Sequence, residues 1–213
     1  TSVSEKQINP NSKWISGVIT TESFVNKAGV EQSEFQEHYF LCNSGEYFIK
    51  KSESHYQSNL RDAVNHHVKV LAHIEEGLWD TNDPNVQSRV GSYICIDSIV
   101  VVDRPVKIIY NDGSSNAHII TPDNYKYSPI KPNESSSGTY SGGEERELEI
   151  NDNLFNEIFL QALNIAEDKT IHIESRIMGS AMLRIKYANS ETQFYIDNGQ
   201  ELDNFESFLN NLK

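Results

Sequence analysis

The fold of the first half of this chain is decided by one short stretch, QSNLRDAVNHH at residues 57–67. Leu60 and Val64 stand four residues apart, so both fall on one side of a helical turn, and the stretch predicts a short helix. The segments on either side of it are rich in β-branched and aromatic residues, which is typical of strands. One short helix is therefore expected inside a series of β-strands.

Three strands are expected before this helix and two after it. The first is WISGVITTESF (14–24), in which Gly17 predicts a bulge or a bend. A hairpin follows in FQEHYFLCNSGEYFIKK (35–51), with Asn-Ser-Gly as its turn. The last two strands are VKVLAHI (68–74) and GSYICIDSIVVVD (91–103). The expected order is three strands, a helix and two strands.

In this order of elements, residues 14–103 resemble an OB-fold, a five-stranded barrel. The resemblance implies that the sheet closes on itself and leaves no exposed strand edge. It also implies that the loop between the fourth and fifth strands lines the ligand-binding face. We therefore expect a polar tether at residues 1–13, an OB-like β-barrel domain at 14–105 and an α+β domain at 106–213.

The second half predicts an antiparallel sheet with two helices on one face, which makes the whole chain mainly β. VKIIYND (106–112) and AHIIT (117–121) predict a hairpin, and the strands on either side of Met178-Gly179 predict another. A helix is expected at 151–168 and a second at 201–212, because their apolar residues recur at helical spacing.

Two segments of the second half are less regular. PDNYKYSPIKPNESSSG (122–138) is rich in Pro, Ser and Asn, so we expect a loop. TYSGGEERELEI (139–150) predicts a strand interrupted by Gly142-Gly143, with one acidic, solvated face.

Two resemblances bear on the function of the chain. The Gly-Gly strand, helix, strand pair and closing helix of residues 138–212 are similar to emfourin-type protein inhibitors of metalloproteases. The acidic, Asn-rich chain with its polar N-terminus also resembles the uncharacterised envelope lipoproteins of Bacteroidetes. The second resemblance implies a periplasmic, cell-envelope or extracellular location, with a lipid anchor upstream of residue 1.

The charge of the chain disfavours two kinds of partner. It has 31 acidic and 18 basic residues among 213, a formal net charge of −13. Nucleic acid and anionic membrane surfaces both require clustered Lys and Arg, so neither is expected as a partner. No apolar run approaches the roughly 20 residues that span a bilayer, so we expect no transmembrane segment.

The loop GLWDTNDPNVQSRVGSY (77–93) is open to three interpretations. Asp80, Asn82 and Asp83 offer oxygen ligands for calcium, although the Gly and Glu spacing of an EF-hand is missing. The same residue types also form turns without any ligand. In the third interpretation the loop contacts a ligand through nearby side chains, namely Trp79, Arg89 and Tyr93. Because base stacking needs a basic groove beside it, sugar or peptide is the ligand expected there.

Cys42 and Cys95 lie in two different predicted strands. They are expected either as two buried thiols or as a disulfide formed in an oxidising compartment. Two cysteines without a nearby histidine do not make a zinc site.

The sequence contains no motif that indicates catalysis. Neither HExxH nor GxSxG occurs, and the histidines are not spaced as metal ligands. We therefore expect a non-enzymatic binding or interaction protein without an obligatory cofactor. The alternatives are glycan or peptide binding on the barrel face and a protease-inhibitor module in the C-terminal half.

Overall fold

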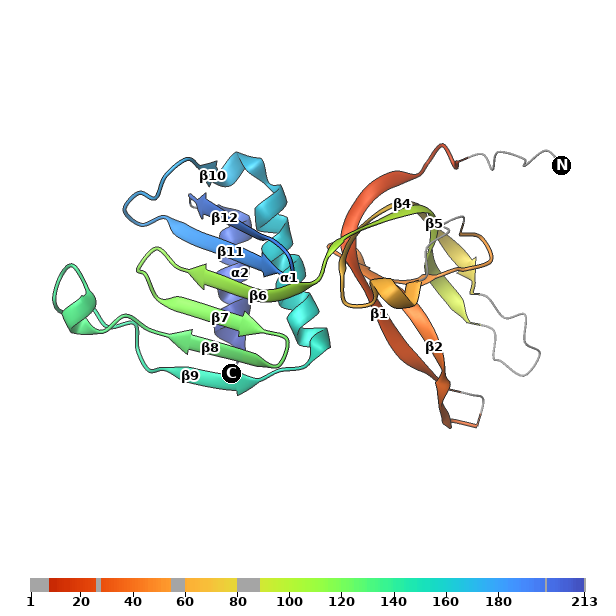
Figure 1. Cartoon of the computed structure of the whole chain (residues 1–213), viewed down its shortest axis with the longest axis horizontal. Helices are drawn as coiled ribbons and strands as arrows, with labels where there is room; N and C mark the ends of the chain where they lie inside the picture. Colours follow the sequence, from red (N-terminus) through yellow and green to blue (C-terminus); the bar gives the residue numbers. More distant parts are fainter. Residues whose placement is uncertain (1–7, 26–27, 55–59, 80–88, 198, 213) are drawn as a thin grey trace. The chain divides into compact units, whose positions relative to one another are not determined.

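The computed structural model describes residues 8–25, 28–54, 60–79, 89–197 and 199–212. The chain divides into two compact units, Thr1–Val102 and Asp103–Lys213. The first unit is a five-stranded barrel, and the second is a seven-stranded sheet with two helices (Figure 1). Within the described residues, no helix has the length and apolar character needed to cross a membrane.

The barrel confirms the expected OB-like fold. Its strands are β1 (Lys13–Val25), β2 (Glu31–Cys42), β3 (Gly45–Ile49), β4 (His67–Leu78) and β5 (Val90–Asp103). They follow the order β1-β2-β3-β5-β4, and β4 pairs back to β1 to close the barrel. The pair β3–β5 is parallel, whereas β1 pairs antiparallel with both β2 and β4.

Alternation along the strands sends one set of side chains into the barrel. The interior is filled mainly by buried apolar residues, among them Ile19, Phe40, Ile49, Val70 and Ile94. The helix expected before β4 is a single 3₁₀ turn, η1 (Leu60–Ala63), and both of its terminal residues are buried in this core. Asn65, two residues after the end of η1, has a φ of 57°, which excludes continuation of the helix.

Gly17 has a role other than a bulge. β1 pairs with β4 up to Val18 and with β2 from Val18 onward, so Gly17 lies where β1 passes from one partner strand to the other. A Cβ atom at Gly17 would lie 2.4 Å from the Leu41 carbonyl oxygen and 2.5 Å from the Phe40 ring. The register shift of β1 occurs later, between Ser23 and Phe24. Gly17 therefore allows close packing at the bend of the strand.

The second unit contains one sheet in the order β10-β12-β11-β6-β7-β8-β9 (Figure 1). Its strands are β6 (Pro105–Asn111), β7 (Ala117–Thr121), β8 (Asn124–Ser128), β9 (Arg146–Glu149), β10 (His172–Ile173), β11 (Ala181–Tyr187) and β12 (Glu191–Ile196). All the recorded strand pairs are antiparallel, as the sequence predicts.

The two expected helices are α1 (Asp152–Glu167) and α2 (Gln200–Asn211), and they pack on one face of this sheet. The Asn151 side chain caps α1 by accepting a hydrogen bond from the Leu154 amide at 2.9 Å. Phe205 of α2 meets Tyr110 of β6 edge to face, with ring centroids 5.2 Å apart. Apolar contacts such as this one, between the helices and the sheet, form the core of the unit.

Two expectations for this sheet are wrong. Residues 124–128 are not loop but strand β8, because pairing with β7 and β9 satisfies their backbone groups. Residues 172–173 form strand β10, which pairs with β12 rather than in a hairpin with β11. Its two-residue length leaves Glu174–Ser180 free to form a long connection to β11.

Candidate functional site

Two of the predicted ligand-binding residues meet on the outer face of the barrel. The Trp79 amide donates a hydrogen bond to the Arg89 carbonyl at 2.9 Å, which closes the base of the loop after β4. The indole stacks on the Phe48 ring at 4.7 Å and an interplanar angle of 5°. The guanidinium carbon of Arg89 lies 4.6 Å from the indole, within cation–π range.

The third predicted residue, Tyr93, lies in the same aromatic cluster but is covered. Only 5% of it is exposed, and the Lys50 ammonium lies 4.2 Å over its ring. Tyr39 is equally buried, and burial beside the Glu37 carboxylate raises the pKa of its hydroxyl above the usual range. A ligand on this face would contact Trp79 and Arg89, while the tyrosine rings serve as packing beneath them.

The guanidinium of Arg89 is already engaged by a carboxylate. Its Nη1 donates to Glu37 Oε2 at 2.9 Å, and its Nη2 donates to the other oxygen of the same carboxylate. Such a two-bond pair is geometrically specific and leaves few donors for an external anion. These contacts therefore hold Arg89 against β2 and Trp79 against β3.

The predicted calcium ligands Asp80, Asn82 and Asp83 lie outside the described residues. Among residues that are described, no three His, Cys, Asp or Glu side chains gather where they could hold a metal ion.

Both cysteines are buried and free. Cys42 belongs to the interior core, whereas Cys95 belongs to the outer aromatic cluster, so the two thiols lie on opposite faces of the sheet. Burial raises the pKa of the Cys95 thiol to about 12. A thiol that remains protonated at neutral pH is a poor nucleophile and a poor metal ligand.

A polar cluster at the start of β1 contains a serine and a histidine. Ser12 Oγ lies 3.1 Å from His73 Nδ1, and the Asn9 amide lies 3.1 Å from the other ring nitrogen. Ser12 also donates a hydrogen bond to Asp97. The Glu75 carboxylate also lies 3.4 Å from His73 Nε2. In a catalytic triad the serine hydroxyl donates its hydrogen to the histidine, whereas the Ser12 hydroxyl donates to Asp97. The cluster instead attaches residues 9–12 to the barrel.

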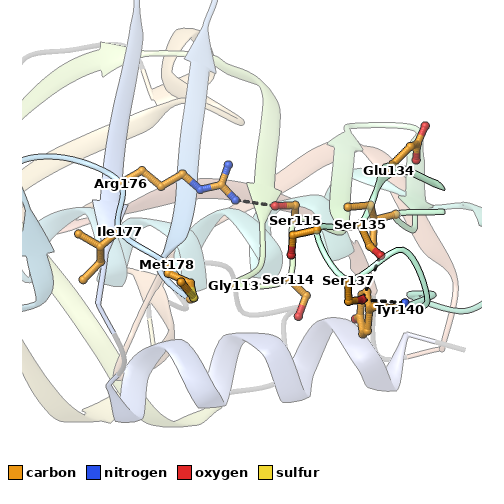
Figure 2. Close-up of a pocket in the computed structure, with 13 residues that line it drawn as sticks. Gly113, Ser114, Ser115, Glu134, Ser135, Ser137, Tyr140, Arg176, Ile177 and Met178 are labelled. Atoms are coloured by element: carbon orange, nitrogen blue, oxygen red, sulfur yellow. Dashed lines mark hydrogen bonds between the residues drawn. The ribbon is translucent and has the colours of Figure 1, made fainter. Parts of the chain in front are cut away.

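The second unit holds a pocket of about 570 Å³, a size typical of small-ligand sites. It lies at one end of the seven-stranded sheet, where the β6–β7, β8–β9 and β10–β11 loops meet. Figure 2 shows Arg176, Ile177 and Met178 on one side, residues 134–140 on the other, and Gly113–Ser115 between them.

Hydroxyl groups dominate the polar part of the pocket wall. They come from Ser114, Ser115, Ser135, Ser136, Ser137 and Tyr140. The guanidinium of Arg176 donates a hydrogen bond to Ser115 Oγ at 2.8 Å (Figure 2). Glu134 lines the opposite side of the pocket, where its carboxylate accepts a hydrogen bond from the Lys131 amide. Ile130, Ile177 and Met178 add apolar surface. The wall can therefore donate and accept hydrogen bonds beside apolar contacts.

The pocket wall is held together by Asn116, which is only 3% exposed. Its Nδ2 donates to Asp112 Oδ2 at 2.7 Å and to the Tyr140 hydroxyl at 3.1 Å. Its Oδ1 accepts a hydrogen bond from the Ile130 amide at 3.0 Å. One buried amide thus connects the β6–β7 turn to both arms of the β8–β9 loop.

A tight turn presents Met178 at the pocket rim. The Ser180 amide bonds to the Ile177 carbonyl at 3.1 Å, and Gly179 has a φ of 83°, a conformation that favours glycine. The turn rests on Gly113, where a Cβ atom would lie only 2.3 Å from the Gly179 oxygen. Met178 is fully exposed and Ile177 is more than half exposed. Both side chains are therefore available to a ligand.

The sequence interpretation missed this pocket because its residues come from three separate connections. The β6–β7 turn and residues 129–145 are rich in residues that form turns, and they contain no catalytic or metal-binding motif. The available signals were the density of Ser and Tyr at residues 135–141 and the apolar Ile-Met pair at 177–178, which stands at a predicted turn. The register of the sheet brings these segments together.

Comparison of the chain with protein-family models, curated proteins and solved structures gave no match. The resemblances to envelope lipoproteins and to emfourin-type inhibitors therefore stay predictions from the sequence.

Proposed function

We propose that this protein binds carbohydrate without transforming it, in the pocket at the loop end of the seven-stranded sheet. The observation that carries the proposal is the position of Tyr140. Its hydroxyl is fixed by the buried Asn116 amide at 3.1 Å, yet 42% of the residue is exposed at the pocket. A ring anchored at its polar end and open on its apolar surface offers a platform for the C–H face of a sugar.

The composition of the wall supports a sugar as ligand. Sugar hydroxyls donate and accept hydrogen bonds, as the serine hydroxyls around Tyr140 do. The exposed Met178 and Ile177 provide apolar contact on the opposite side. The hydrogen bonds of Asn116 hold the wall in place before binding, which lowers the entropy that a ligand must overcome.

A peptide fits this location less well. Extended peptides bind by adding a strand to the edge of a sheet, whereas this pocket lies at the strand ends. All four residues of the edge strand β9 are exposed, and three of them, Arg146, Glu147 and Glu149, are charged. Charged residues on an edge discourage strand addition.

The experiment is a glycan array followed by calorimetry on the sugars that bind. Tyr140→Ala should weaken binding by at least about tenfold, as loss of a central aromatic contact does. Trp14→Ala is the matched control, because Trp14 is an exposed ring of the barrel unit and its loss should leave affinity unchanged.

Trp79→Ala separates this proposal from binding on the barrel face. Loss of sugar binding in Trp79→Ala, with Tyr140→Ala unaffected, would move the site to the barrel. Absence of binding to every sugar on the array would refute the proposed function.

A further inference from the structure

A second hollow of about 450 Å³ lies beside the pocket. Three residues line both hollows, namely Ser115, Ile130 and Glu134. The second hollow adds residues from both arms of the β8–β9 loop, including Ser128, Lys131, Ser141 and Glu145. The two hollows are therefore adjacent compartments of one surface.

The divide between the hollows is held in place by hydrogen bonds. The Ile130 amide donates to the buried Asn116 side chain at 3.0 Å. Glu134 accepts from the Lys131 amide at 3.0 Å, and its own amide donates to the Lys131 carbonyl at 2.9 Å. A fixed divide keeps the hollows separate, so one compact ligand cannot fill both.

The second hollow is polar in the same manner as the first. It presents the hydroxyls of Ser128 and Ser141. Its carboxylate, Glu145, pairs with Lys126 at 2.5 Å, and this hydrogen bond lowers the pKa of Glu145. The paired carboxylate stays ionised at neutral pH and accepts hydrogen bonds without adding net charge. A second sugar unit, which also carries hydroxyl groups, therefore fits the second hollow in the same way that the first unit fits the first hollow.

We propose that the ligand is a linear oligosaccharide of at least two units, with one unit in each hollow and the linkage crossing over Ile130. This inference rests on the carbohydrate-binding function proposed above. Once the first unit is bound, the second binds as part of the same molecule, so its effective concentration is high.

The test is calorimetry with homologous cello-, chito- and malto-oligosaccharides of one to six units. The series that binds should gain at least about tenfold in affinity between one unit and the length that reaches the second hollow. Further units should then add little.

Two exposed serines of the same loop give matched variants. Ser141 lines only the second hollow, and Ser136 lines only the first. Ser141→Trp should abolish the gain with length and leave the affinity for the single sugar unchanged. Ser136→Trp should weaken binding at every length.

The outcomes separate the two proposals. A single sugar that binds as tightly as its oligomers overturns the two-compartment inference and leaves the carbohydrate function standing. A gain with length that survives Ser141→Trp also overturns the inference. Failure of every sugar and oligomer to bind removes both proposals.

Discussion

The amide of Asn116 donates a hydrogen bond to the hydroxyl of Tyr140 at 3.1 Å, across 24 positions of sequence. This bond fixes an exposed aromatic ring to a buried side chain. It is the contact that converts the long β8–β9 connection into one wall of a pocket.

Replacing Asn116 should destabilise the second unit and weaken ligand binding together. Asn116→Ala removes three side-chain hydrogen bonds and leaves the Ile130 amide without a partner, a loss of about 3 kcal/mol in the free energy of unfolding. Urea unfolding of the second unit measures this loss. Asn133→Ala, at an exposed position of the β8–β9 loop, is the control. Equal stability of the two variants would contradict the role assigned to Asn116.

Gly113→Ala should disturb the turn that presents Met178. The added Cβ would lie 2.3 Å from the Gly179 oxygen, so the backbone of one loop must move, at a cost of about 2 kcal/mol. Because both loops line the pocket, sugar affinity should fall by at least about tenfold. Gly138→Ala has open space at its Cβ and a φ of 67°, so it should incur backbone strain alone. Unchanged affinity in Gly113→Ala would show that this close approach does not shape the pocket.

The stability of the second unit should fall as the pH is lowered from 6.5 to 4. Burial lowers the pKa of His118 from 6.5 to about 4. Between these values the unfolded chain binds a proton at His118 that the folded unit excludes, so the contribution of His118 to stability is largest above pH 6.5. It should decrease by about 3 kcal/mol by pH 4, with no further loss from this group below that pH.

His118→Phe retains a ring in the aromatic surroundings of Tyr110 and Tyr127 but cannot titrate. Unfolding midpoints of this variant should depend less steeply on pH between 4 and 6.5 than those of the unaltered protein. Identical pH profiles would mean that His118 is not the residue responsible.

Thiol titration should find both cysteines unreactive in the folded protein. Cys42 and Cys95 are free and buried, and burial raises the pKa of Cys95 to about 12. In denaturant without reductant, two thiols should react per chain. Recovery of fewer than two would reveal a disulfide and contradict the arrangement on opposite faces of the sheet.

The barrel was predictable because its signals are local. Its strands are runs rich in β-branched and aromatic residues, and the helical turn at Leu60–Ala63 lies between the third and fourth strands, as the sequence predicts. Trp79 and Arg89 were also expected near one another, since they lie at the two ends of one loop. The stacking of Trp79 on Phe48 depends on strand β3, which is distant in the sequence, so it could not be predicted.

The seven-stranded sheet was predictable only in part. The five residues of β8 lie between turn-forming segments and are a strand because β7 and β9 supply hydrogen-bond partners on both sides. β10 pairs with β12 because of the path that residues 174–180 take between β10 and β11. No local pattern in the sequence indicates that path.

The sequence by itself determined the five strands and the helical turn of the barrel in their OB-like order, the two amphipathic helices and the acidic net charge. These follow from short-range spacing of apolar and polar residues, which acts within a few positions of the chain. Only the tertiary structure decided the pocket. Strand register carries residues 113–115, 130–140 and 176–179 to one end of a sheet, and the buried amide of Asn116 joins two of these segments. Contacts between such distant positions depend on the packing of the whole unit, and that packing leaves no periodic trace in the sequence.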